Sequence, residues 1–324
     1  AQKCVNCQKH VPSLEDFRQY QAALRRIRSR LQREAFALPV TQAFPQALVG
    51  NYGVNPHDGY RYWYDYFEHP ATDAMPFLAD QRARYREWYP EFSETGYTCA
   101  MPVVYTWYPT FEWYDFEKAD YRWFYNMLKE ASSVGQNTSA STPLIPFVHW
   151  HTTAPPKNPN PDVRQMSEAA YQDLLWHMLL RGHDSFFLWC LTEELADEVR
   201  LVHQVYRESF QYSGFLSRGE PVSFDVPAEP SSVVSGLRLG DRVLIRRSEY
   251  AATTAPASPV QVNVSEKPEH QIEVPAIVGN QILSVKPHDA GPPVPDSPLL
   301  LHRGTESLFP IGFYELPASD VELK

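Results

Sequence analysis

The sequence has few cysteines and lacks the common motifs of several enzyme classes. Its four cysteines include one CxxC pair, Cys4 and Cys7, with no second CxxC and no paired histidines, so no metal site is predicted. GxGxxG, P-loop, HExxH and GxSxG motifs are absent, which leaves nucleotide-binding, zinc-protease and serine-hydrolase functions without support. No cofactor is expected. No signal peptide and no apolar run long enough to span a membrane are found, so no membrane partner is expected either.

Basic residues are fewer than acidic ones. Lys and Arg total 29 against 39 Asp and Glu, which gives a net charge of −10 and a pI near 5.6. Nucleic acid is therefore not expected as a partner. Arginines do cluster over residues 25–33, but Leu24, Ile27 and Leu31 interleave with them. That pattern favours a solvated helix face, and a binding patch for an acidic polymer is the alternative.

Aromatic residues are abundant, at 14% of the chain. Many lie beside Pro, Gly, Asp and Glu instead of in periodic apolar runs, which is typical of sugar-binding clefts, although packing in the core is the alternative explanation. Two N-x-S/T sequons, at Asn137 and Asn263, are compatible with a secreted protein. We therefore expect a secreted or extracytoplasmic location.

One stretch, residues 143–190, predicts a complete βαβ unit. Leu144 to His149 is a short apolar run typical of a buried strand, and apolar residues then recur at helical steps from Ser167 until Gly182 ends the pattern. Phe186 to Cys190 is again apolar and strand-like. A strand, a helix and a second strand in this order predict a parallel sheet.

The preceding sequence extends the same alternation. Strands are predicted at Phe44–Val54 and Cys99–Trp107, and helices at Leu14–Ala37, Arg82–Trp88, Phe116–Ser132 and Glu193–Phe215. Four β/α units in succession make half of a (β/α)8 barrel or most of a smaller open sheet. The predicted fold class is thus α/β, with a barrel-like domain over residues 1–218.

After Gly219 the helical periodicity ends and proline and serine become more frequent. Short strand-like runs alternate with turns, and Leu239-Gly240-Asp241 is a good turn signal. This pattern predicts a β-sandwich-like domain over residues 219–324 with a proline-rich connector. The expected strands are Val222–Val226, Arg242–Arg247, Val260–Val264, Gln271–Val274, Gln281–Val285 and Pro310–Leu316.

Ligands of parallel α/β sheets bind at the carboxyl ends of the strands, where this sequence places aromatic, histidine and acidic residues. Flat rings stack on sugar faces, and two carboxylates can act as acid and base across a glycosidic bond. The predicted catalytic acids are Glu112, Glu193 and Asp58, and the predicted substrate-binding residues are Tyr52, Tyr105, Trp107, Tyr108, His149, Trp150 and His151. We expect Trp107, Tyr108 and Trp150 to line one open groove.

Each candidate also has a structural explanation. His149 and His151 alternate along a strand and suit a satisfied polar pair better than a metal pair. Glu193 and Glu112 can interact favourably with the dipoles of the helices that follow them, because each lies near a helix amino end. Asp58 precedes Gly59, as in an ordinary turn.

Four segments resemble the later half of a hyaluronidase-type barrel glycosidase: FPQALVGNYGVNPHDGYRYW, PVVYTWYP, PLIPFVHWH and GHDSFFLWC. The resemblance covers about Leu14 to Phe215 and implies substrate contacts for Tyr105 and Tyr108. The family's catalytic acid lies in an Asp-x-Glu element on an earlier strand, which is not found before Leu14. Either another chain or segment completes the barrel, or the fold is not that barrel.

The sequence thus predicts a carbohydrate-active protein, a glycoside hydrolase with a polysaccharide or oligosaccharide as its partner. A non-catalytic sugar-binding or accessory subunit is one alternative. A structural or assembly protein that uses its aromatic surface as an interface is another.

Overall fold

The computed structural model describes residues 14–51, 89–105, 119–150, 166–189, 195–227, 230–250, 258–264, 271–275 and 279–284. The helices are α2 (Leu14–Gln32), α3 (Leu38–Ala43), α6 (Ala119–Asn137), α7 (Glu168–Leu179), α8 (Leu195–Ser209) and α9 (Ser213–Arg218), with a π-helical turn at Arg33–Ala37 and a 3-10 turn at Phe210–Tyr212. The strands are β1 (Val103–Tyr105), β2 (Phe147–His149), β3 (Phe187–Leu188), β4 (Glu220–Pro221), β5 (Ser232–Leu239), β6 (Arg242–Glu249), β7 (Val260–Asn263), β8 (Gln271–Val274) and β9 (Gly279–Ser284).

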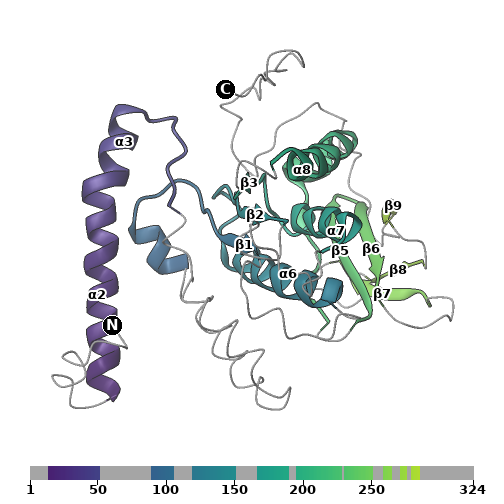
Figure 1. The fold of residues 1–324 in the computed structure, drawn as a ribbon, viewed down its shortest axis with the longest axis horizontal. Helices are drawn as coiled ribbons and strands as arrows, with labels where there is room; N and C mark the ends of the chain where they lie inside the picture. The colour runs from purple at the N-terminus through teal and green to yellow at the C-terminus, as the bar shows by residue number, and fades with distance from the viewer. Residues whose placement is uncertain are drawn as a thin grey trace.

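The predicted βαβ unit is confirmed. Strands β1, β2 and β3 lie side by side in this order and run parallel, with Tyr105 opposite His149 and Val148 opposite Leu188 (Figure 1). The strands are shorter than predicted, and Leu144 only forms an isolated bridge to Ala100.

The ends of α7 follow from the residues that the sequence marks. The hydroxyl of Ser167 caps the helix by accepting a hydrogen bond from the Ala170 amide at 3.2 Å. Gly182 adopts a φ of 93°, a left-handed conformation that favours glycine and lets the chain leave the helix.

Two strand predictions are wrong for the residues described. Phe44–Val54 forms no strand over residues 44–51, although the Val49 carbonyl accepts hydrogen bonds from Thr98 and Cys99. Val222–Val226 forms none either, because after Val222 donates to the Gly236 carbonyl the chain leaves the sheet.

The C-terminal strands form an antiparallel sheet of order β4-β5-β6-β9 and a separate β7-β8 hairpin. Gly240, with a φ of 62°, makes the turn between β5 and β6, as the sequence predicts. Strand β5 was not predicted. Its residues Val233 to Leu237 are buried on both faces of the strand, so the sequence lacks the alternation that marks a half-exposed strand.

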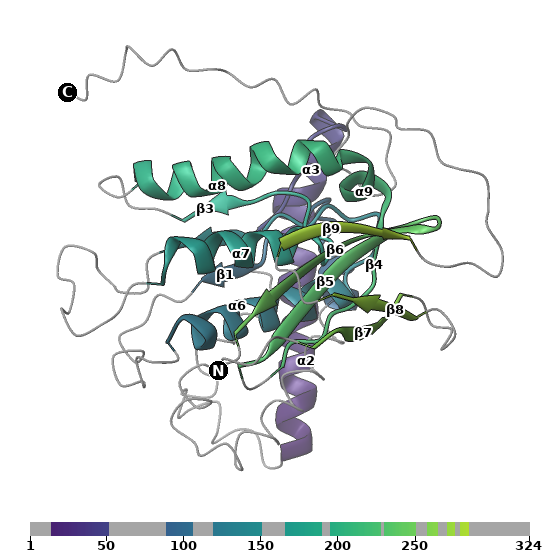
Figure 2. The same ribbon diagram turned by 90° about the vertical axis from the view of Figure 1, so that its right-hand side faces the viewer.

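Both faces of this antiparallel sheet are covered. One face packs on α6 and α7. These helices lie between it and the parallel sheet in Figure 1, and the antiparallel sheet lies in front of them in Figure 2. The other face packs on the β7-β8 hairpin through a second apolar cluster. The chain is therefore a mixed α/β protein with one parallel and two antiparallel sheets in the part described.

The largest apolar cluster crosses residue 218, the predicted domain boundary. It contains Val104 and Val148 from the parallel sheet, residues of α6, α7 and α8, and Leu237 and Leu244 from the antiparallel sheet. The division at residue 218 stays a prediction, but the two parts share a core.

This shared core predicts that damage on the antiparallel side destabilises both parts. Leu237, 1% exposed, should cost about 2 to 5 kcal/mol of unfolding free energy when replaced by Ala. Ile282→Ala, at a position 48% exposed on β9, is the control and should cost under about 1 kcal/mol. Urea unfolding followed by tryptophan fluorescence and by circular dichroism should give one shifted transition. Two separate transitions, of which only one moves, would contradict the shared core.

Candidate functional site

The candidate site lies at the carboxyl end of the parallel sheet. Strands β1 and β2 end together there, because Tyr105 pairs with His149. Of the predicted site residues, His149, Trp150 and the backbone of Tyr105 belong to the described structure. The others lie outside the described residues: Tyr52, Asp58, Trp107, Tyr108, Glu112, His151 and Glu193.

His149 is buried at the end of β2, with 1% of its side chain exposed. Its Nδ1 lies 3.4 Å from Oε2 of Glu198, a fully buried residue of α8. An imidazole and a carboxylate thus face each other in a dry environment, where electrostatic interactions are stronger than in water.

Trp150 follows His149 and is half-buried. Its backbone N–H donates to Oε1 of Glu198 at 2.8 Å, and its indole N–H donates to the Met166 carbonyl at 2.8 Å. The ring packs against the main core, 6.5 Å from the ring of Tyr171. These contacts give Trp150 a structural role, and its predicted place in an open sugar-binding groove stays a prediction.

Glu198 joins three elements at this point. Besides Trp150 and His149 of the β2 end, it accepts a 2.6 Å hydrogen bond from the hydroxyl of Tyr171 on α7. Glu198 is not among the predicted site residues. A signal was present, because Glu198, Leu201 and Val205 share one helical face, and two apolar residues on that face predict that the acid is buried.

The cluster contains three groups capable of proton transfer: a carboxylate, an imidazole and a phenol. Each is almost fully buried, with Tyr171 and Glu198 at 0% and His149 at 1% exposure. In the part of the chain that is described, no three His, Cys, Asp or Glu side chains lie close enough to hold a metal ion. A carboxylate, an imidazole and a phenol can each take part in proton transfer or hydrogen bonding.

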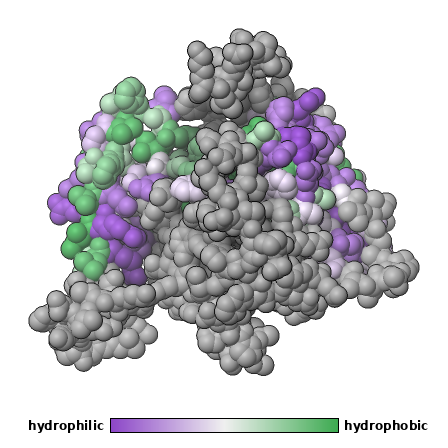
Figure 3. Space-filling view, viewed as in Figure 1, coloured by the Kyte–Doolittle hydropathy of each residue, from purple (hydrophilic) through white to green (hydrophobic). Residues whose placement is uncertain are grey.

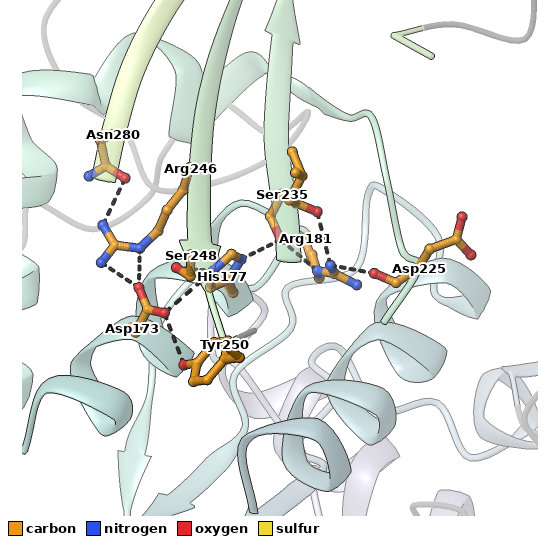
Figure 4. Close-up of polar contacts among 10 residues, drawn as sticks. Asp173, His177, Arg181, Asp225, Ser235, Arg246, Ser248, Tyr250 and Asn280 are labelled. Carbon is orange, nitrogen blue, oxygen red and sulfur yellow. Dashed lines mark hydrogen bonds and ion pairs between the residues drawn. The ribbon is translucent and has the colours of Figure 1, made fainter. Parts of the chain in front are cut away.

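A second polar cluster lies between α7 and the antiparallel sheet (Figure 4). Asp173 and His177 on α7, and Arg181 in the turn after it, are spaced four residues apart and so share one face. That face meets Ser235 of β5 and Arg246 and Ser248 of β6. None of these contacts could be predicted, because the partners are 50 to 80 residues apart in sequence.

The hydrogen bonds of this cluster form one directed chain. Arg181 Nε donates to Ser235 Oγ at 2.7 Å, and Ser235 Oγ also lies 2.7 Å from His177 Nδ1. Because Ser248 donates its one proton to Asp173, the ring proton of His177 is on Nε2, and the Ser235 hydroxyl donates to Nδ1. His177 Nε2–H then donates to Ser248 Oγ at 2.9 Å. Ser248 hydrogen-bonds in turn to Asp173. The chain thus runs from a cation to an anion through a neutral imidazole.

The two ends of the chain are satisfied by further partners. Arg181 also donates to Ser132 Oγ and to the carbonyls of Asp225 and Val234, at 2.8 to 3.1 Å. Asp173 accepts from Arg246 Nε at 2.6 Å and from the Tyr250 hydroxyl at 3.1 Å. Although the cluster combines Ser, His and Asp, His177 is 0% exposed and each serine is already engaged. The cluster therefore has a structural role, which is to fix the antiparallel sheet against α7.

Burial dominates the electrostatics of the chain. It lowers the pKa of His177 to about 3; the attraction of Asp173 acts against this shift, and the repulsion from Arg181 and Arg246 adds to it. Burial also lowers the pKa of Arg181 to about 9, which leaves it charged at neutral pH. For Asp173 burial acts to raise the pKa, but His177, Arg246 and Ser248 together lower it.

The buried thiol of Cys99 fits the default expectation for a cysteine beside an apolar strand. It is 2% exposed, and burial raises its pKa to about 11.

Within the described ranges no helix is both long and apolar enough to cross a membrane.

Comparison with known proteins finds no matching family model, no similar curated protein and no similar solved structure.

The low pKa of His177 predicts acid sensitivity. The unfolded chain takes up a proton at this residue below about pH 6.5, but the folded chain does so only near 3. Stability from this residue is therefore complete above pH 6.5 and falls by roughly 1.4 kcal/mol per pH unit as the pH drops towards 3. The free energy of unfolding, measured in urea at several pH values between 7 and 4, should fall less steeply with decreasing pH for His177→Gln than for the unmodified chain.

The control is His203→Gln, at an exposed position on α8. It should keep the slope of the unmodified chain. Equal slopes for all three proteins would contradict a buried, neutral His177.

Proposed function

We propose that this chain is a carbohydrate-active protein, a glycoside hydrolase that acts on a polysaccharide through acid and base carboxylates. The observation that supports it most is the parallel order β1-β2-β3. Their carboxyl ends share one edge, and each strand is followed in sequence by a segment that contains predicted site residues. Those segments are residues 106–118, 151–165 and 189–194.

In this proposal two of the three acids, Glu112, Glu193 and Asp58, flank the glycosidic bond. One protonates the leaving oxygen, and the other acts as nucleophile or activates a water, at separations of roughly 5 Å or 6.5 to 9.5 Å respectively. The tyrosines and tryptophans stack on the sugar rings. His149 and His151 hydrogen-bond hydroxyls.

The finer architecture is part of the same proposal. The parallel sheet with α6, α7 and α8 would be the later part of a (β/α)8 barrel, completed by another chain or segment. The antiparallel sheet with its β7-β8 hairpin would be a C-terminal β-sandwich, supported by the apolar cluster between the sheet and the hairpin. The protein would be secreted or extracytoplasmic.

The test is a panel of polysaccharides assayed for release of reducing ends. Glu112→Gln, Glu193→Gln and Asp58→Asn are compared with Glu168→Gln, which alters an exposed acid on α7. At least one of the three variants at predicted acids should be about 100-fold or more less active than the unmodified chain, because general acid-base catalysis contributes about that much. Glu168→Gln should keep full activity. Binding without cleavage would favour the sugar-binding alternative, and neither binding nor cleavage contradicts both.

A second candidate, an assembly role, is favoured by a row of exposed apolar residues on α2, α3 and the segment after them. Figure 3 shows the apolar surface along this part of the molecule. Leu24, Ile27 and Leu31 recur at three- and four-residue steps and share one helix face, with exposures of 38%, 64% and 60%. The row continues through Phe36, Leu38, Val40, Phe44 and Leu48.

Two of the charges beside this row are paired within the chain. Arg28 forms an ion pair with Glu91 at 2.9 Å, and Arg30 forms one with Glu34 at 2.7 Å. Exposed apolar residues that gather on one element favour an interface, whereas exposed apolar residues that are scattered singly do not.

The assembly role predicts a native mass above that of one chain. Light scattering after size exclusion should give a dimer or larger for the unmodified protein and a monomer for Ile27→Glu combined with Leu31→Glu. Arg26→Glu, at an exposed position of α2 outside the row, is the control and should keep the larger mass. A monomer at every concentration tested would contradict the assembly role.

A further inference from the structure

The carboxyl end of β2 is held by a side chain of α8. The Trp189 amide donates to the Val148 carbonyl at 2.8 Å, which is the last backbone bond between β3 and β2 among those seen. Two residues beyond Val148, the Trp150 amide donates to the side chain of Glu198 instead, at 2.8 Å. Glu198 therefore helps to fix the β2 end, together with the pairing of His149 with Tyr105 of β1.

Glu198 is itself fixed in one orientation. Its Oε1 accepts from the Trp150 amide and from the Tyr171 hydroxyl, at 2.8 and 2.6 Å. The side chain is completely buried. Hydrogen bonds to a charged acceptor are stronger than those between neutral groups, and two of them from different elements leave the carboxylate little rotational freedom.

This orientation directs the second oxygen at His149. Oε2 lies 3.4 Å from Nδ1 of the imidazole. This pair is an electrostatic contact and not an aligned hydrogen bond. A carboxylate is negatively charged and carries no proton, so it favours the tautomer whose proton is on the facing Nδ1. In that tautomer Nε2 carries no proton and is the basic nitrogen of the ring.

We propose that Glu198 is a positioning residue that holds His149 in the Nδ1–H tautomer, with Tyr171 orienting Glu198. This tautomer does not rest on the proposed function, because it is set by contacts within the chain and can be measured without a substrate.

The test is long-range 1H–15N correlation NMR of the full chain labelled with 15N-histidine at pH 7. The His149 signals are identified by their loss in His149→Gln. In the unmodified chain His149 should carry its proton on Nδ1. In Glu198→Gln the proton should move to Nε2, because the amide oxygen keeps the Trp150 and Tyr171 donors while the amide NH2 now faces Nδ1 and requires an acceptor there.

Two further variants accompany Glu198→Gln. Glu168→Gln, on the exposed surface of α7, should leave the His149 signals unchanged. Tyr171→Phe removes one of the two donors that orient Glu198 and should shift part of the His149 population to the Nε2–H tautomer. Circular dichroism confirms that each variant is folded.

A proton on Nε2 of His149 in the unmodified chain, whether or not Nδ1 also carries one, would overturn the proposal, and this outcome requires no variant to fold. Unchanged His149 signals in a folded Glu198→Gln protein would also overturn it. If the tautomer switches as expected but no polysaccharide is bound or cleaved, the role of Glu198 stands and the proposed function fails.

Discussion

The burial of α7 beyond its first turn is the constraint on which the rest of this structure depends. Between Ala170 and Leu179 most of the helix is enclosed, with α6 and α8 packed beside it and the antiparallel sheet against another face. A helix buried on several sides can keep polar groups only where partners meet them, since an unpaired polar group in the interior costs about 1 to 3 kcal/mol. Each buried polar side chain of α7 therefore has a partner on a neighbouring element and shows which element packs on that face of the helix.

Two separate polar clusters start from this helix. Tyr171 reaches the β2 end through Glu198, and Asp173, His177 and Arg181 reach the antiparallel sheet. One helix therefore contacts both the edge of the parallel sheet, where the proposed function places its substrate, and the antiparallel sheet, which comes later in the sequence. A directed hydrogen-bond chain with a cation at one end and an anion at the other defines the helix-sheet position more narrowly than apolar packing alone.

The two adjacent arginines of β6 illustrate how the sheet uses its two faces. Arg246 points to α7 and pairs with Asp173. Arg247 points to the other face, where it is 1% exposed, bonds Glu249 and donates to carbonyls of Val274, Pro275 and Ser258. Side chains alternate along a strand, so neighbouring residues of the same type hold two different layers.

Local patterns determined much of the secondary structure. Ser167 and Gly182 marked the ends of α7, Gly240 marked the β5-β6 turn, and the strand-helix-strand order was enough for a parallel sheet, because these features depend on neighbouring residues and on chain connectivity. Strand β5 was not predicted, because it is buried on both faces and its sequence shows no alternation of apolar and polar residues. His149 could be placed at a strand end from its sequence alone.

Only the tertiary structure decided what His149 meets there. Glu198 is 49 residues further along the chain, and no local rule relates the two, although its place on the apolar face of α8 signalled burial. The same holds for His177 and its serines, which are 58 and 71 residues away. Backbone conformation follows from nearby residues, whereas the partner of a buried polar group is selected by the packing of whole elements, which no single stretch of sequence contains.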